Sequence, residues 1–314
     1  MTRPLALVSA ARGVGDIVRI TPLIGVCAGL GYDVDLLLAP DYADSVTLVE
    51  GGPGVRRVYF LPSPWSRDPR ARLDGLEQET YDVATFTTWT LPLRARVRAR
   101  RTVAFSQSQW LRDGDAACVA AIARDLSWIG ALPPPFAMTS GRRFGLPSDT
   151  VALHPGCKPD WPWKKWHGFD ELAKRLPNVA IIGTAADVEN AGTYFARPFA
   201  WPAHAVDFVG RLSLADTAAL IAECAALVSN DSGLMHVGAA LGVPTFGVFG
   251  ITSPARESLP VANMHPVTKG LPCEEACRRA PWGRRDCHLH LECLRTLTAS
   301  DVHAQLTARV AAHG

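Results

Sequence analysis

The stretch richest in chemically useful residues is "SNDSGLMHVGAALGVPTFGVFG", residues 229–250 of a 314-residue chain. A turn-forming Asn-Asp-Ser-Gly opens a short helix of small residues, and a β-branched and aromatic run follows. The first turn of a helix presents N–H groups that bind phosphate or carboxylate groups. Asp231, Ser232 and Gly233 are therefore predicted to contact an anionic ligand. His236, on the same turn, is either a further ligand contact or a structural histidine.

A second stretch, "HPGCKPDWPWKKWHGFDELAKRL", combines histidine, lysine and tryptophan after another apolar run. His154 ends that run, and Lys164 and Lys165 precede a helix predicted over 168–176. Lysines at a helix N-terminus oppose the helix macrodipole, so a bound anion such as a diphosphate would explain them. The alternative is that their aliphatic stems lie over the neighbouring tryptophans.

Near the N-terminus, "SAARGVGDIVRITP" contains a candidate acid–base residue. Gly13 and Gly15 let the backbone turn tightly and approach a ligand, and Asp16 stands at the start of the predicted helix. The stretch is not a dinucleotide-binding fingerprint, because Val18 occupies the third glycine position. Asp16 has two interpretations, a helix N-cap and a general base.

Two further loops carry weaker signals. Residues 183–187, which begin with Gly183, follow an apolar run and are predicted to contact the same ligand as the lysine loop. Ser213 stands three residues before Asp216, a spacing that predicts a helix start of the capping-box kind. That capping role is structural whatever else the residue does.

The scaffold for these loops is an alternation of apolar runs and helical stretches, repeated twice. Strands separated by helices of about ten to fifteen residues predict right-handed βαβ units and parallel sheets, which bind ligands outside the carboxyl ends of their strands. The predicted fold is therefore α/β, with two doubly wound Rossmann-like domains, 1–140 and 150–314, a cleft between them and a linker in the Pro/Gly-rich segment 131–149. The predicted strands are 4–10, 32–39, 56–62, 81–88, 101–107, 151–156, 178–185, 204–210, 225–231 and 243–250.

The bulk composition narrows the class of protein. Apolar residues make up 48% of the chain and charged residues 20%, which is ordinary for a globular protein. A net charge of +2 gives no general field for nucleic acid. No apolar run reaches the ~18 residues of a membrane-spanning helix, and the N-terminal apolar run reads as a strand rather than a signal peptide. Four scattered cysteines are predicted to be reduced and buried: Cys27, Cys118, Cys157 and Cys224.

Four motifs together resemble glycosyltransferase family 9, the ADP-heptose-using heptosyltransferases. They are "GDIVRITPLIGVCAGLGYDVDLLL", "HPG…WPWKKWHGFDELAKRL", "VGRLSLADTAALIAECAALVSNDSGLMHVGAALGVPTFGVFGITSPA" and a cysteine-bearing tail. The similarity runs from about residue 4 to the end of the chain, and the order of the motifs is its specific part. The resemblance implies a GT-B fold and an inverting transfer that needs no catalytic cofactor or essential divalent metal. It also implies that the first domain binds the acceptor and the second binds the nucleotide-sugar donor.

The resemblance also implies roles for single residues. Asp16 corresponds to the proposed base of the family, and Lys164 corresponds to a lysine that binds the donor diphosphate. Ala215 stands where members often place an acidic residue for the donor ribose, which leaves the nucleotide open. The full set of residues expected to bind the substrate or the donor is Gly13, Gly15, His154, Lys164, Lys165, Gly183, Ser213, Asp231, Ser232, Gly233 and His236.

The C-terminal region, 273–293, is a cysteine-rich tail. Its spacing, Cys273-x3-Cys277-x9-Cys287-x5-Cys293, fits a structural zinc or iron site better than disulfides in a chain without a signal peptide. His288 and His290 are alternative ligands, and a metal-free tail is the other interpretation. Some relatives that modify autotransporter proteins carry an iron-bound cysteine finger of this general kind.

A charge run, "RARVRARR" at 94–101, places five arginines in the presumed acceptor domain. A solvated face is the default interpretation, and a contact with phosphorylated lipopolysaccharide core or an anionic membrane surface is the functional one.

The function expected from sequence is heptose transfer from ADP-heptose to an acceptor hydroxyl on lipopolysaccharide core or on a protein. The expected partners are the nucleotide sugar and a lipid-linked saccharide or protein acceptor, without nucleic acid. We expect a cytoplasmic enzyme, and leave open attachment to the inner membrane and oligomer formation. The alternatives are another nucleotide-sugar transferase or epimerase of the same fold, and a non-catalytic protein that binds sugar nucleotides.

Overall fold

The computed structural model describes residues 3–9, 13–38, 40–61, 75–87, 90–188, 198–279, 287 and 290–310. The chain divides into two compact units, Met1–Met138 and Thr139–Gly314. The boundary between them along the chain falls within the proline- and glycine-rich segment 131–149. No helix in the described part of the chain is both long and apolar enough to cross a membrane.

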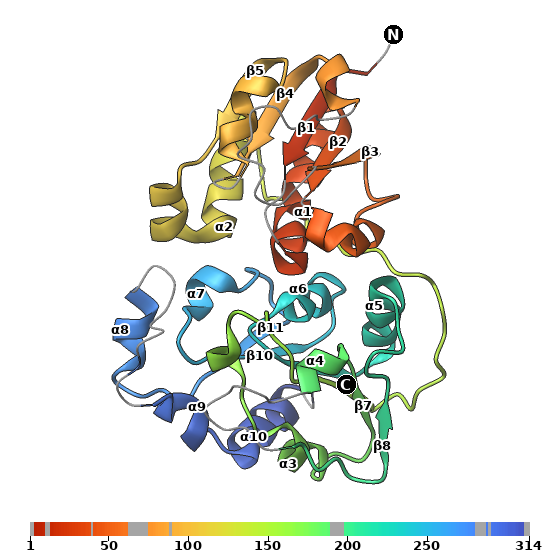
Figure 1. Ribbon diagram of the computed structural model, residues 1–314, viewed down its shortest axis with the longest axis vertical. Coiled ribbons are helices and arrows are strands. Elements are labelled where there is room, and N and C mark those ends of the chain that lie inside the picture. The colour runs from red at the N-terminus through yellow and green to blue at the C-terminus, as the bar shows by residue number, and fades with distance from the viewer. Residues whose placement is uncertain are drawn as a thin grey trace. The chain divides into compact units, whose positions relative to one another are not determined.

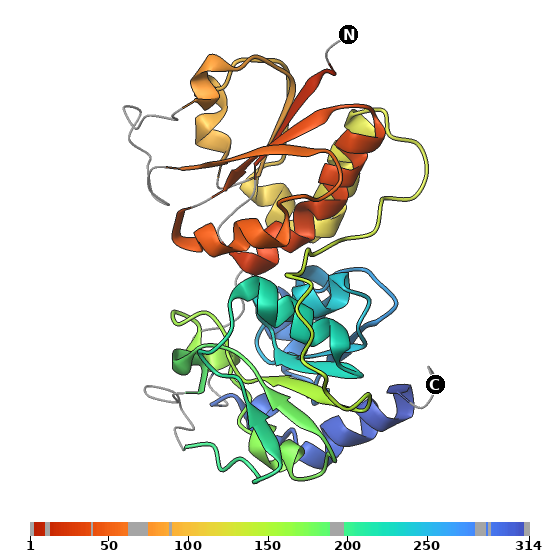
Figure 2. The same ribbon diagram turned by 90° about the vertical axis from the view of Figure 1, so that its right-hand side faces the viewer.

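The first unit is built on a five-stranded sheet in the order β3-β2-β1-β4-β5, in which all neighbours are parallel. Figure 1 labels its elements, and Figure 2 shows α1 and α2 side by side. The central strands are apolar along most of their length because both faces of a parallel sheet are covered. The elements are β1 Leu5–Ser9, α1 Val14–Gly29, β2 Asp33–Leu38, η1 Pro40–Leu48, β3 Val55–Phe60, η2 Leu76–Gln78, β4 Tyr81–Phe86, η3 Leu91–Arg96, β5 Ala99–Ala104 and α2 Gln107–Asp125.

The second unit holds a six-stranded parallel sheet in the order β11-β10-β9-β6-β7-β8. Figure 1 shows α3 and α10 on one face of this sheet and α5 and α6 on the other. The strands are β6 Val151–His154, β7 Val179–Ile181, β8 Ala205–Asp207, β9 Ala226–Asn230, β10 Thr245–Val248 and β11 Met264–Val267. The helices are η4 Pro162–Lys164, α3 Phe169–Ala173, α4 Ala185–Val188, α5 Leu214–Glu223, α6 Gly233–Ala240, α7 Pro254–Glu257, α8 Glu274–Arg279, α9 Glu292–Thr296 and α10 Ala299–Val310.

The ten predicted strands are confirmed in position, with ends that differ by a few residues. An eleventh strand, β11, was missed because "MHPV" contains a proline, which cannot donate to a sheet ladder. The structure places β11 at the edge of the sheet, where Pro266 is tolerated. The helix predicted over 168–176 is shorter, Phe169–Ala173.

The four scattered cysteines are buried, as predicted, and none is in a disulfide. Burial raises the pKa of each of these thiols to about 12. They are therefore neutral near pH 7 and pack as small apolar side chains.

Candidate functional site

The order of the strands marks where a ligand would bind in the second unit. The order reverses between β6 and β9, and open α/β sheets bind ligands at the carboxyl ends of strands beside such a reversal. β6 ends at His154 and β9 ends at Asn230, and His154 is paired in register with Ser229. The fold therefore brings together two stretches that lie far apart in the sequence.

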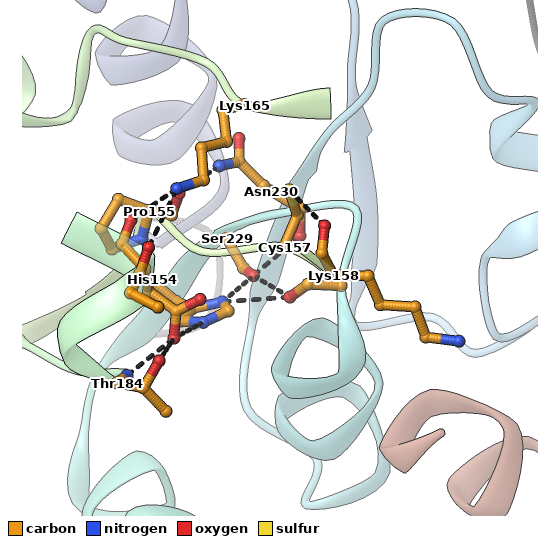
Figure 3. Close-up of polar contacts among 11 residues, drawn as sticks. His154, Pro155, Cys157, Lys158, Lys165, Thr184, Ser229 and Asn230 are labelled. Atoms are coloured by element: carbon orange, nitrogen blue, oxygen red, sulfur yellow. Dashed lines mark hydrogen bonds and ion pairs between the residues drawn. The ribbon is translucent and has the colours of Figure 1, made fainter. Parts of the chain in front are cut away.

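His154 is the centre of a hydrogen-bonded cluster at these strand ends (Figure 3). Its Nδ1 lies 3.0 Å from the Oγ of Ser229 and 3.0 Å from the Oγ of Ser232. Its Nε2 lies 3.6 Å from an oxygen of Asp187, and the residue is only 5% exposed. Both ring nitrogens thus face protein groups, and one of them contacts the hydroxyl of Ser232. The predicted ligand contact of His154 stays a prediction.

Ser232 is the N-cap of α6, but its side chain makes no capping hydrogen bond to the helix. A serine at this position ordinarily accepts a hydrogen bond from an N–H of the first turn. Here its hydroxyl is turned toward His154 and Ser229 instead, at 3.0 and 3.1 Å. The cap of α6 is therefore arranged so that the serine side chain does not cover the first N–H groups.

Asp187 completes the cluster from α4. The backbone N–H and hydroxyl of Thr184 donate to its Oδ2 at 2.7 and 2.9 Å. Burial alone would raise the pKa of Asp187, but the nearby His154 and the donors of Thr184 lower it to about 2. Gly156 and Gly183 are packed closely around it: a Cβ at Gly156 would lie 2.0 Å from Asp187, and Gly183 has a φ of +127°.

Lys164 forms a partly buried ion pair with Asp231 beside α6. The Lys164 Nζ lies 2.7 Å from Asp231 Oδ2, and the hydroxyl of Thr252 donates to the same oxygen at 2.7 Å. Burial would raise the pKa of Asp231, but the charge and hydrogen bond of Lys164 lower it. Burial would lower the pKa of Lys164, but Asp231 and Glu257 hold it above its ordinary value. The ammonium of Lys164 is therefore held next to the start of α6, paired with Asp231.

The two adjacent lysines have different neighbours. The ammonium of Lys165 donates to the backbone carbonyls of Ala186 and Asp187 at 3.2 and 3.1 Å, and the residue is 6% exposed. It therefore fastens the lysine loop to α4, whereas Lys164 faces Asp231. The predicted ligand role of Lys165 stays a prediction.

Asn230, which sequence reasoning missed, fixes the lysine loop on the sheet. Its Nδ2 donates to the carbonyl of Pro155 at 2.7 Å, and its Oδ1 accepts the N–H of Trp166 at 3.0 Å. The signal for it was present in the sequence, as an amide directly after an apolar strand. Ser229, Asp187 and Thr252 were also missed, because only the folded chain brings them beside His154 and Asp231.

Two other candidates have clear positions. Ser213 caps α5, and its Oγ accepts the N–H of Asp216 at 3.1 Å. His236 is 3% exposed, one turn into α6, and helps to lower the pKa of Asp231. Capping by Ser213 is confirmed, while ligand contact by either residue stays a prediction.

In the first unit, Asp16 lies at the corresponding place, in the first turn of α1 after β1. The strand order of this sheet reverses between β1 and β4. The N-cap of α1 is Gly13, so the interpretation of Asp16 as an N-cap is wrong. Asp16 instead lies two residues inside α1, with its Oδ1 2.5 Å from the guanidinium of Arg19. Gly15 is likewise inside the helix.

The arginine run 94–101 makes contacts within its own unit, in keeping with a solvated structural face. The contacts are Arg96 to Glu77 at 2.8 Å, Arg100 to Asp82 at 2.9 Å, and hydrogen bonds from Arg98 and Arg101 to the carbonyls of Glu77 and Asp125.

The cysteine-rich tail is partly described. Cys277 and Cys293 are buried, and Cys273 and Cys287 are half-buried. Burial and the neighbouring Glu274 raise the pKa of Cys293 to about 12. Within the described ranges, no three His, Cys, Asp or Glu residues are grouped so that they could hold a metal ion. Residues 280–286 and His288 lie outside those ranges, and the metal site stays a prediction.

The fold defines a class of protein. An ADP-heptose lipopolysaccharide heptosyltransferase II from Escherichia coli matches with a TM-score of 0.70 and 20% identity, covering 98% of this chain and 99% of that one. The iron-containing dodecameric glycosyltransferase TibC from enterotoxigenic E. coli matches with a TM-score of 0.63 and 16% identity, covering 98% and 76%. At these identities the likeness shows the fold alone, which is GT-B, as predicted.

The sequence comparisons show a similarity over part of the chain. Residues 135–279 match the family model of glycosyltransferase family 9 (heptosyltransferase). Lipopolysaccharide heptosyltransferase 2 of Salmonella typhimurium is 34% identical over an alignment of 148 residues, with a stated coverage of 40% of this chain. That match spans 41% of the relative's length. Residues 135–279 are thus similar to glycosyltransferase family 9, the family that the motifs resemble.

The low pKa of Asp187 makes a prediction about acid stability. Because its pKa in the folded state is about 2, below the ordinary 3.8, ionised Asp187 stabilises the fold above about pH 4. This contribution, about 2 kcal/mol, is lost as the pH falls toward 2. We expect Asp187→Asn to lower the free energy of unfolding at pH 7 by about 1–2 kcal/mol.

The difference between Asp187→Asn and the wild type should shrink between pH 5 and pH 3 in chemical denaturation. Asp207→Asn is the control, because its side chain is 56% exposed on β8. A difference that stays constant with pH would contradict the role of the carboxylate charge.

Proposed function

We propose that this protein is an inverting glycosyltransferase that moves heptose from ADP-heptose to an acceptor hydroxyl. The observation that carries the proposal is the start of α6, where the N-cap side chain is turned aside and a lysine stands next to the helix. Helix N-termini with a neighbouring cation are well suited to phosphate groups. The names of the relatives supply the sugar and the nucleotide.

The donor diphosphate is proposed to bind at the first turn of α6. Ser232 and Gly233 would contribute N–H groups, and Lys164 would share its charge between Asp231 and the phosphates. As the bond from the anomeric carbon to the diphosphate oxygen breaks, negative charge grows on the leaving ADP. The same N–H groups and ammonium would stabilise that charge.

The base is proposed to be Asp16. Its carboxylate would take the proton of the acceptor hydroxyl as the oxygen attacks the anomeric carbon from the face opposite the diphosphate. One carbon–oxygen bond forms as another breaks, and the proton ends on Asp16 before it passes to solvent. This balance needs no redox cofactor.

The acceptor is proposed to be lipopolysaccharide core, the substrate class in the relatives' names. We propose that transfer takes place in the cytoplasm, at the inner face of the inner membrane. A non-catalytic sugar-nucleotide-binding protein is the competing function. It would bind ADP-heptose without releasing ADP in the presence of any acceptor.

The phosphate site can be tested with ADP as the probe. We expect Lys164→Ala to weaken ADP binding by about 1–3 kcal/mol in calorimetry, because a charge-assisted contact is lost. In Lys164→Ala alone, the carboxylate of Asp231 loses its cation and could itself repel ADP. The double variant Lys164→Ala/Asp231→Asn removes that carboxylate as well, and it should still bind ADP weakly. Lys165→Ala is the matched control at the next position, expected to cost folding stability rather than ADP affinity. The reverse result would assign the phosphates to Lys165.

The base can be tested by turnover. We expect Asp16→Asn to bind ADP-heptose nearly as well as the wild type and to release ADP about two to four orders of magnitude more slowly. The control is Asp33→Asn, which changes the first residue of β2 in the same unit and should retain wild-type turnover. Turnover of Asp16→Asn within a few-fold of wild type would remove Asp16 from the mechanism.

The tail is proposed to hold a structural zinc or iron ion on Cys273, Cys277, Cys287 and Cys293. Four thiolates suit these metals, and four protein ligands leave no position for a substrate. The iron-containing relative TibC adds support. Elemental analysis of protein purified without added metal should find about one ion per chain. The variant Cys277→Ser should lose the metal ion. The control Cys224→Ser, at the end of α5, should keep it. Wild-type protein that is folded and free of metal would contradict the proposal.

A further inference from the structure

Arg19 stands between two carboxylates in the first unit. Its Nη2 lies 2.5 Å from Asp16 Oδ1, and its Nε lies 3.0 Å from Asp115 Oδ2. The side chains of Arg19, Asp16 and Asp115 are only 9%, 22% and 13% exposed. A guanidinium this well buried is stable only when it is paired, so the two carboxylates and the arginine hold one another in place.

The second helix of the unit is shaped to supply Asp115. Helical geometry in α2 is broken at Gly114, whose φ of +76° lies in the left-handed region that favours glycine. Asp115 follows directly and begins a new helical segment, where a carboxylate is favoured by the helix dipole. The indole N–H of Trp110 donates to Asp115 Oδ1 at 2.8 Å. Asp115 is therefore fixed from one side by Trp110 and presented to Arg19 on the other.

We infer that Arg19 and Asp115 are positioning residues that hold Asp16 in the orientation and charge state needed to remove the acceptor proton. This inference rests on the proposed function, because it assigns Asp16 the role of base. Arg19 acts directly, since its guanidinium contacts one carboxylate oxygen of Asp16. Asp115 acts through Arg19, since it shares the same guanidinium.

The two residues have opposite electrostatic effects on Asp16. The positive charge of Arg19 favours ionised Asp16, while the negative charge of Asp115 disfavours it. A base too strongly stabilised by a cation is a poor proton acceptor, so Asp115 keeps Asp16 basic while Arg19 keeps it ionised.

Other titratable groups that the structure describes on α2 lie near Asp115 in the sequence. Asp113 and Arg112 lie on the exposed side and pair with each other at 2.8 Å. Burial raises the pKa of Cys118 to about 12, so this thiol is neutral over the range that matters.

A plain structural link between α1 and α2 is the competing explanation, and pH profiles distinguish the two. Turnover would be followed as ADP release from ADP-heptose with heptose-deficient lipopolysaccharide core as acceptor. We expect Arg19→Met to move the acidic limb of the kcat profile up by about 1 pH unit or more, since a neighbouring cation is removed. We expect Asp115→Asn to move the limb down, with donor KM nearly unchanged in both variants.

Two further variants sharpen the test. Arg19→Lys keeps the charge but cannot contact both carboxylates with a planar group, so its limb should stay near wild type while kcat falls roughly tenfold. Asp113→Asn removes an equal charge two residues from Asp115 and is the matched control, with an unmoved limb and wild-type kcat. If Arg19→Met does not fold, Arg19→Lys and Asp115→Asn still carry the comparison.

The outcomes separate the inference from the function on which it rests. Loss of activity in the Arg19 and Asp115 variants with unmoved limbs, alongside an inactive Asp16→Asn, would overturn the positioning role alone. Full activity of Asp16→Asn, or no ADP release by the wild type, would overturn the proposed function and the inference with it.

Discussion

A partly buried ion pair directly after β9 is the constraint on which the second unit's site depends. Lys164 and Asp231 approach to 2.7 Å in surroundings where either charge alone would be costly. The loop that carries the lysine is fixed on the sheet by Asn230, which contacts Pro155 and Trp166. The polar groups at this strand end therefore fix the lysine loop, and the position of the loop determines where the ammonium of Lys164 lies.

The start of α6 departs from the usual N-cap arrangement. A serine N-cap that bonds to its own helix typically contributes about 1 kcal/mol of stability, and the side chain of Ser232 makes no such bond. His154 and Ser229 hold its hydroxyl instead, and Asp187 fixes the histidine from the other side. Departures of this kind are expected where a site requires a geometry that stability alone would not select.

Much of this arrangement follows from the sequence, because apolar runs mark buried strands and ligand loops follow strand ends. What the sequence could not supply is the pairing of distant groups. Nothing in "KKW" shows that Lys165 faces backbone carbonyls while its neighbour faces a carboxylate. Asp187 looks like an ordinary helix residue until β6 and β7 are placed side by side. The edge strand β11 was not predicted because Pro266 cannot donate a hydrogen bond to a sheet ladder.

Both units contain a carboxylate–cation pair near the start of a helix, but the charged groups around the two pairs differ. Each places a carboxylate and a cation in or beside the first helical turn after a strand at the reversal of its sheet. In the second unit one lysine, Lys164, contacts one carboxylate, Asp231. In the first unit the guanidinium of Arg19 is shared between two carboxylates, Asp16 and Asp115. A cation beside helix N–H groups suits a diphosphate, whereas a carboxylate that shares its cation with a second carboxylate suits a group that must accept a proton. This difference is the physical basis for proposing that the second unit binds the donor and the first unit supplies the base.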